Sequence, residues 1–171
     1  TGKVSRYWNP VYVKNGKYVP ATENDYGPDM IQEFMLDCCK KSKERNQPFF
    51  AYYTTTLPHD PYDSTPDPNN PGKKIAGSLK ASVEYLDYQV GRVIAELEAN
   101  GMRENTIIIF CGDNGTHGAG KWSLEREAGV RVPFIVNWPG HVRTGVSREL
   151  MDFADLMPTF AEIAGVPTIL N

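Results

Sequence analysis

A chain of 171 residues is long enough for one domain with a proper hydrophobic core and too short for two. Its 40% apolar and 23% charged residues are ordinary for a globular protein. A formal net charge of −3 shows none of the excess positive charge that is typical of nucleic-acid-binding proteins. No apolar run approaches the ~20 residues that a membrane span needs. Composition therefore argues against nucleic-acid binding and against a membrane-spanning protein.

The first 26 residues contain one clear structural signal. Two short β-prone runs flank Asn15-Gly16, the pair that a type I′ turn requires, so a β-hairpin is predicted over residues 11–20. A lone hairpin is marginal, so we expect segment 1–26 to pack on a main body formed by residues 27–171. That body opens with a predicted helix from Gly27 to about Arg45, with proline and acidic residues in its first turn.

Residues 48–111 predict a strand, a helix and a second strand. The apolar run 48–56 ends in a loop rich in Pro, Asp, Asn and Gly that reaches residue 77, and a loop that long is usually functional or disordered. Apolar residues at helical spacing follow over 78–100, stopped by Asn100-Gly101, and the β-branched run 106–111 reads as a strand buried on both faces. Together they predict a right-handed βαβ unit with parallel strands.

The remaining elements complete an α/β pattern. Residues 122–131 predict a loop or short helical turn, 132–138 a third strand, and 155–165 a short helix that Asp152 or Asp155 could cap. The expected fold is a three-layer α/β/α sandwich with a mostly parallel sheet, present as a partial domain, plus the N-terminal β-hairpin.

Three cysteines cannot form a complete disulfide set. Cys38 and Cys39 are neighbours on the first predicted helix and point about 100° apart, and Cys111 ends a strand. We expect all three to be buried, small apolar residues, and their number leaves the cellular compartment undecided.

Chemistry-bearing side chains follow two of the predicted strands. Asp113 and Asn114 come directly after strand 106–111 and offer adjacent hard oxygens, the ligands that calcium and magnesium prefer, although Asp-Asn-Gly alone is also ordinary turn chemistry. Lys121 lies a few residues further on, and His59 follows strand 48–56. In open α/β sheets, sites form past the carboxyl ends of the strands, so these side chains predict a functional site there.

An ordered series of motifs spanning about residues 45 to 167 resembles the sulfatase family, in the alkaline-phosphatase-like α/β superfamily. The motifs are Pro48-Phe49-Phe50, Leu57-Pro58-His59-Asp60-Pro61, Val83-Glu84-Tyr85-Leu86-Asp87, Asp113-Asn114-Gly115, Gly120-Lys121-Trp122, Gly129-Val130-Arg131-Val132-Pro133, Trp138-Pro139-Gly140 and Asp155-Leu156-Met157-Pro158-Thr159.

The resemblance implies hydrolysis of sulfate esters with a divalent cation, usually calcium, and a cysteine or serine converted to formylglycine. It assigns Asp113 and Asn114 as two metal ligands, His59 as the histidine that contacts the sulfate or leaving-group oxygen, and Lys121 as the sulfate-binding lysine. A cation, an ammonium and an imidazole would all oppose the negative charge that develops during transfer. His117 has no clear family counterpart and is interpreted as a supporting or surface histidine.

The chain departs from the family pattern in two respects. The segment between Lys121 and Gly129 is one residue longer than usual, which puts the substrate class in doubt. None of the cysteines, nor Ser64, is followed by the Pro/Ala-x-Arg of the nucleophile motif, and the paired aspartates and Lys-x-His segment of the family's first half are missing. The chain therefore resembles the second half of a catalytic domain, and we expect it to be inactive alone.

Two alternatives stay open: a non-catalytic remnant acting as a binding module, and a sister phosphoesterase or phosphonate hydrolase. The expected substrate is a sulfated small molecule or carbohydrate, and a further partner would be the first, N-terminal half of the domain. The resemblance implies a periplasmic, secreted or lysosomal location.

Overall fold

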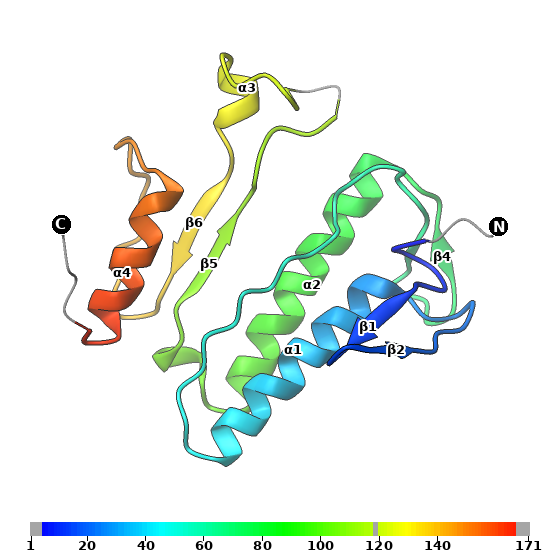
Figure 1. Cartoon of the computed structure of the whole chain (residues 1–171), viewed down its shortest axis with the longest axis horizontal. Coiled ribbons are helices and arrows are strands. Elements are labelled where there is room, and N and C mark those ends of the chain that lie inside the picture. Colours follow the sequence, from blue (N-terminus) through cyan, green and yellow to red (C-terminus); the bar gives the residue numbers. More distant parts are fainter. Residues whose placement is uncertain (1–4, 118–119, 167–171) are drawn as a thin grey trace.

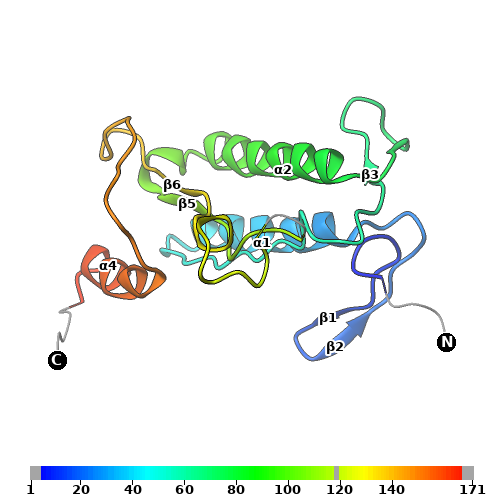
Figure 2. The same ribbon diagram turned by 90° about the horizontal axis from the view of Figure 1, so that it is seen from above.

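The computed structural model describes residues 5–117 and 120–166 and is built around two long helices, α1 (Gly27–Glu44) and α2 (Leu79–Ala99). The two helices lie side by side (Figures 1 and 2), and a two-stranded ribbon of β5 (Ile108–Cys111) and β6 (Phe134–Asn137) runs next to them. The C-terminal helix α4 (Leu156–Ile163) lies beyond β6 in Figure 1.

The helix boundaries follow from local chemistry and confirm the predicted helices. Helix α1 starts with proline in its first turn and ends with lysines in its last, which suits the helix dipole. Helix α2 is capped by Ser78, whose Oγ accepts a hydrogen bond from the Ala81 backbone N–H at 3.0 Å, and it ends before Gly101, which has a φ of +63°.

The predicted hairpin, the short helical turn after residue 122 and the C-terminal helix are also present, and the structure adds a 3₁₀ turn that the sequence did not predict. The hairpin forms between β1 (Tyr12–Lys14) and β2 (Lys17–Val19), with positive φ at both Asn15 and Gly16 as a type I′ turn requires. Segment 122–131 contains the single turn α3 (Glu127–Val130), and a 3₁₀ turn, η1 (Arg103–Asn105), leads into β5. Asp152 and Asp155 together cap the 3₁₀ turn η2 (Phe153–Asp155) that precedes α4.

Two clusters of buried side chains pack around the long helices. The first joins segments outside the helices to α2, and the second joins α1 to α2. One consists of Tyr7, Tyr26, Leu57, Tyr85 and Leu86, and the other of Cys39, Leu97 and Met102. The first cluster therefore ties the N-terminal segment to α2 and to the loop after residue 56. The division into segments 1–26 and 27–171 stays a prediction.

The predicted parallel βαβ unit is wrong for this chain, although the arrangement of helices and small sheets is of the α/β kind. Strand β5 pairs with β6 in antiparallel register, from Ile108 opposite Asn137 to Cys111 opposite Phe134. Residues 48–56 form no strand, and within the described residues no backbone–backbone hydrogen bond joins 48–55 to another segment. A strand needs a neighbour to satisfy its backbone, and none of the described segments supplies one here.

The predicted burial of strand 106–111 and of two of the three cysteines is wrong. Strand β5 is half-buried rather than buried on both faces, because the two-stranded ribbon leaves part of its surface uncovered. Cys39 is buried as predicted, but Cys38 and Cys111 are exposed.

The loop from residue 57 to 77 contains a small hairpin of its own, β3 (Thr65–Pro66) paired with β4 (Lys74–Ile75). Of the helices in the described part of the chain, none is long and apolar enough to cross a membrane.

Candidate functional site

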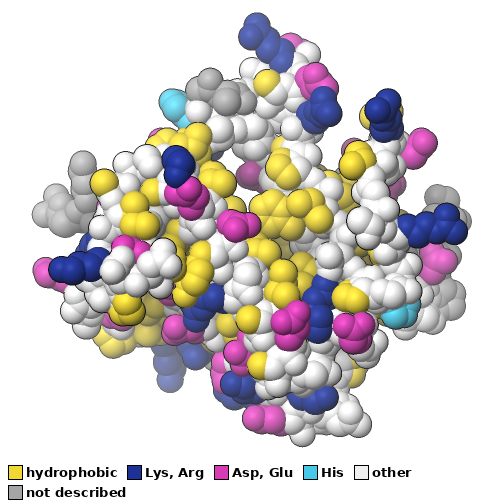
Figure 3. Space-filling model, turned by 180° about the vertical axis from the view of Figure 1, so that it is seen from behind, with side chains coloured by type: hydrophobic (Ala, Val, Ile, Leu, Met, Phe, Trp, Pro, Cys, Tyr) yellow, Lys and Arg dark blue, Asp and Glu magenta, His cyan; other side chains and the backbone are white. Residues whose placement is uncertain are grey.

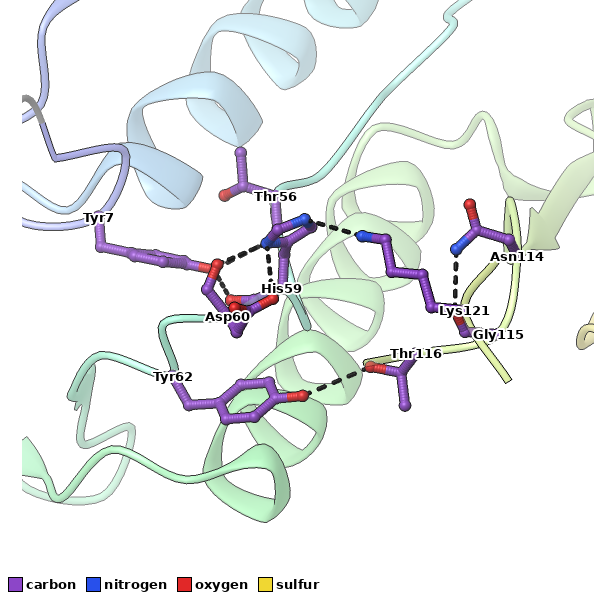
Figure 4. A network of polar contacts seen from close by, with 9 residues as sticks. All are labelled: Tyr7, Thr56, His59, Asp60, Tyr62, Asn114, Gly115, Thr116 and Lys121. Atoms are coloured by element: carbon purple, nitrogen blue, oxygen red, sulfur yellow. Dashed lines mark hydrogen bonds and ion pairs between the residues drawn. The ribbon is translucent and has the colours of Figure 1, made fainter. Parts of the chain in front are cut away.

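Two loops far apart in the sequence meet through His59 and Lys121. His59 follows the extended segment 48–56, and Lys121 lies in the loop between β5 and α3. Lys121 Nζ lies 3.1 Å from His59 Nε2, and Figure 4 shows the lysine side chain extending straight toward the imidazole. The structure thus brings together the two residues that the sequence suggested for sulfate contact.

The hydrogen bonds of His59 define which ring nitrogen carries the proton. A lysine ammonium can only donate, so Nε2 accepts from Lys121 and the proton of the neutral ring sits on Nδ1. Nδ1 faces the backbone carbonyl of Asp60, which accepts that proton, and the Asp60 carboxylate lies 3.5 Å away. The ring is therefore oriented from both sides.

A buried tyrosine from the N-terminal segment holds the backbone of the His59 loop. Tyr7 is 3% exposed, and its hydroxyl donates hydrogen bonds to the carbonyl oxygens of His59 and of Thr56, the latter at 3.2 Å. Burial raises the pKa of Tyr7, so its hydroxyl stays protonated and remains a donor. Trp8 adds a second tie, because its indole N–H donates to the Ser64 carbonyl at 2.7 Å.

The two site loops are also linked to each other. The hydroxyls of Tyr62 and Thr116 lie 3.4 Å apart, and the Lys121 backbone N–H donates to the Thr116 carbonyl at 3.2 Å. The Tyr62–Thr116 contact thus joins the two loops, and the hydrogen bond from Lys121 to Thr116 closes the lysine-bearing loop on itself.

Asp113 and Asn114 lie at the carboxyl end of β5, and both are exposed. Asp113 Oδ1 accepts the Asn114 backbone N–H at 2.9 Å, and the Asn114 amide donates to the Gly115 carbonyl at 2.9 Å. These local bonds are turn chemistry, and they leave Asp113 Oδ2 and Asn114 Oδ1 without a hydrogen-bond partner among the described residues.

This donor set fits part of a hard-cation site. The free carboxylate and amide oxygens are the right type for calcium, which takes six to eight oxygen ligands. Within residues 5–117 and 120–166, no group of three or more His, Cys, Asp or Glu side chains is placed to hold a metal ion. Asp113 and Asn114 therefore supply two ligands at most. His117, three residues further on, is exposed.

Sequence reasoning did not find the residues that support the site. Tyr7 and Trp8 lie about 50 residues before their carbonyl acceptors, and Tyr62 lies 54 residues before Thr116. A buried tyrosine or tryptophan usually finds a hydrogen-bond partner, but the sequence shows no pattern that names the partner.

The fold and the site define an α/β protein in which the loop after β5 brings a lysine to a histidine of another loop, a pairing of cationic and hydrogen-bonding side chains that suits an anion. The family model described as Sulfatase matches residues 5–166, and the chain belongs to the sulfatase family.

Relatives and solved structures agree with this assignment. The chain is 31% identical to the uncharacterized sulfatase YdeN of Escherichia coli over 94% of its length, and 33% identical to human arylsulfatase A over 78%. It superposes on the crystal structure of Ps i-CgsB with a TM-score of 0.74 and 31% identity over 90% of the chain, which confirms the α/β fold class. It also matches the structure of Ps i-CgsB in complex with k-i-k-neocarrahexaose, with a TM-score of 0.72 and 30% identity.

The chain spans only about a third of the proteins it matches. It covers 31% of YdeN, 28% of human arylsulfatase A and 37% of the Ps i-CgsB chain.

Proposed function

We propose that this chain supplies part of the active site of a sulfate-ester hydrolase, with His59 and Lys121 binding the sulfate group. The observation that carries the proposal is the 3.1 Å contact between Lys121 Nζ and His59 Nε2. An ammonium has three N–H donors, so one can hold the imidazole while two remain for sulfate oxygens. Charge-assisted hydrogen bonds of this kind are stronger than neutral ones.

The two side chains suit different stages of ester cleavage. Negative charge develops on the ester oxygens as the S–O bond breaks, and donors already aimed at those oxygens stabilise it. Lys121 would bind oxygens that remain on sulfur. In this structure His59 Nε2 accepts a hydrogen bond from Lys121. Donation to the leaving-group oxygen would therefore require His59 to carry a proton on Nε2 and Lys121 to turn from the imidazole to the sulfate oxygens.

The bond-forming step is assigned to residues outside this chain. No cysteine or serine here lies in the nucleophile pattern, so the proposal expects no sulfate-ester hydrolysis from the chain alone. Asp113 and Asn114 are proposed as two ligands of a divalent cation, with calcium as the expected ion. Such a cation would neutralise charge on the sulfate oxygens and orient the group.

Sulfate binding by isothermal titration calorimetry tests the anion site. Lys121→Met should weaken inorganic sulfate binding about tenfold or more, because it removes a charge-assisted hydrogen bond worth ~1.5–3 kcal/mol. The matched control is Lys80→Met, since Lys80 is exposed on α2 and pairs with Glu84. Equal sulfate affinity in all three proteins would refute the proposal. A clear preference for inorganic phosphate over sulfate would instead favour the phosphoesterase alternative.

Calcium calorimetry tests the two metal ligands separately. We expect binding tighter than about millimolar that disappears in Asp113→Ala and survives in Asp87→Ala, which removes the same charge from an exposed position on α2. If Asp87→Ala lowered calcium affinity as much as Asp113→Ala, the binding would be a general charge effect and Asp113 would lose its assigned role.

A sulfated carbohydrate is the proposed substrate class. Support comes from the Ps i-CgsB relative, whose structure was obtained with k-i-k-neocarrahexaose. The expected location outside the cytosol stays a prediction from family membership.

The proposed macromolecular partner is an extended strand from the remainder of a sulfatase domain, docking on segment 48–56. Between α1 and this segment lies an open groove of about 550 Å³, lined by apolar side chains that include Phe34, Met35 and Phe49. Phe50 is 71% and Tyr52 84% exposed, and Figure 3 shows hydrophobic side chains gathered across the middle of one face. A strand added here would satisfy the free backbone groups and cover the aromatic rings.

Hydrogen exchange checks this surface directly. Amides of residues 49–55 should exchange rapidly in this chain, while amides in the middle of α2 stay protected. Slow exchange in 49–55 would mean that the edge is already covered in solution, which would contradict an open docking edge.

A further inference from the structure

Trp122 is the most exposed aromatic side chain at the candidate site. It directly follows Lys121 and is 85% exposed, and the Lys121 ammonium lies 5.6 Å from the centre of its ring. The other two tryptophans of the chain are half-buried. Trp8 lies under the Lys74 ammonium, and Trp138 stacks on His141 with ring centroids 4.0 Å apart.

The backbone at Trp122 is strained for a bulky residue. Its φ is +73°, in the left-handed region that glycine favours. The Ser123 backbone N–H donates to the Gly120 carbonyl at 3.0 Å, which makes Trp122 the third residue of a four-residue turn. Turns that require positive φ at this position usually have glycine or asparagine there.

The surrounding loop holds Trp122 in this position. A side chain at Gly120 would collide with the Ala128 carbonyl oxygen at 2.1 Å, and one at Gly129 with the Ser123 carbonyl oxygen at 2.0 Å. The turn is therefore packed tightly against residues 128–129. Strain that persists beside a reactive group, in a conformation fixed by its surroundings, often serves function.

We propose that the Trp122 indole is a stacking platform for the sugar ring that carries the sulfate ester; this inference rests on the proposed function of His59 and Lys121. A pyranose ring has an apolar face of C–H groups, and an exposed indole offers a flat, rigid surface of matching polarity. With the sulfate on Lys121, the sugar to which it is esterified extends over the neighbouring indole. The cation–π contact with Lys121 keeps the two binding elements together.

The geometry assigns different ligand groups to the two neighbouring residues. Lys121 binds the anion whatever it is attached to, and Trp122 adds affinity only when a sugar is attached. Trp122 would thus act as a specificity residue for carbohydrate sulfates over inorganic sulfate. An indole that instead covers another polypeptide would give no such preference.

Calorimetry and tryptophan fluorescence on the 171-residue chain test the inference. The probes are sodium sulfate, glucose 6-sulfate, galactose 4-sulfate and unsulfated glucose. The wild-type chain should bind at least one sulfated sugar about two- to tenfold more tightly than sulfate, as expected for one aromatic contact. Trp122→Ala should lower the ratio of sulfated-sugar affinity to sulfate affinity to about one, and Trp122→Phe should keep most of the wild-type ratio. Trp138→Phe, which removes a distant indole, should behave like wild type.

Fluorescence adds a readout that a structural role would not change. Bound sulfated sugar should protect one indole from iodide quenching in wild type and in Trp138→Phe, and that protection should be missing in Trp122→Phe. If Lys121→Met leaves sulfate binding intact, or if wild type binds no probe, the proposed anion site fails and this inference with it. If Lys121→Met abolishes sulfate binding while Trp122→Ala binds sulfated sugars like wild type, the inference alone is overturned.

Discussion

Replacing Tyr85 by phenylalanine should destabilise the chain, because this hydroxyl connects its two long helices. Tyr85 on α2 is 4% exposed, and its hydroxyl donates to both carboxylate oxygens of Asp29 on α1, at 3.0 and 2.8 Å. Asp29 also accepts from the Gln89 side-chain amide at 2.9 Å and lies 3.7 Å from the Arg92 guanidinium. The carboxylate thus accepts hydrogen bonds from two side chains of α2 and forms an ion pair with a third.

The size of the expected loss in unfolding free energy depends on which partners Asp29 keeps after the substitution. A hydrogen bond to a charged acceptor contributes ~1.5–3 kcal/mol. The Asp29 side chain is 24% exposed and retains Gln89 and Arg92, so water can partly replace the lost hydroxyl. We therefore expect Tyr85→Phe to lower the free energy of unfolding by about 1.5 kcal/mol, the lower end of that range.

Urea denaturation followed by circular dichroism measures this loss. The denaturation midpoint should fall while the slope with urea stays constant. The matched control is Tyr88→Phe, because Tyr88 lies on the same helix, contacts the Tyr85 ring with centroids 5.4 Å apart and is 40% exposed. An exposed hydroxyl without a charged partner should change stability by less than about 0.5 kcal/mol. Equal losses in the two variants, or a Tyr85→Phe loss below that value, would refute the assignment.

Two more predictions concern pH and backbone strain. Burial raises the pKa of Tyr53 from 10.0 to about 12 and, together with the Asp29 carboxylate, raises that of Tyr85 further. The two buried, protonated tyrosines stabilise the folded state fully below pH 10, and this stabilisation is lost as the pH rises through their folded-state pKa values. Above pH 10 the free energy of unfolding should therefore fall by up to about 1.4 kcal/mol per pH unit for each tyrosine. Tyr53→Phe should flatten this dependence in denaturation curves at pH 9 to 12, and an unchanged slope would contradict it. Trp122→Gly should raise the unfolding free energy by up to about 1 kcal/mol, because the relief of left-handed strain exceeds the added chain entropy; a lower melting temperature would count against a strained turn.

Helices and turns could be predicted from the sequence because their causes are local. Ser78 caps α2 through a residue three positions away, and the Asn15-Gly16 hairpin turn needs only the positive φ that these two residues tolerate. The strands were less predictable. The apolar runs 48–56 and 106–111 look alike in sequence, yet only the second finds a strand to pair with, because pairing depends on which neighbour is present.

The sequence by itself determined the family of this protein, because the order and spacing of its motifs can be found without a structure. The same motifs named the candidate site residues His59, Asp113, Asn114 and Lys121. Only the tertiary structure decided that Lys121 reaches the His59 imidazole, that Tyr7 holds the His59 backbone, and that Trp122 stands exposed on a strained turn. These contacts join residues up to 62 positions apart, or depend on how a loop closes. They follow from packing across the whole chain, which no local pattern specifies.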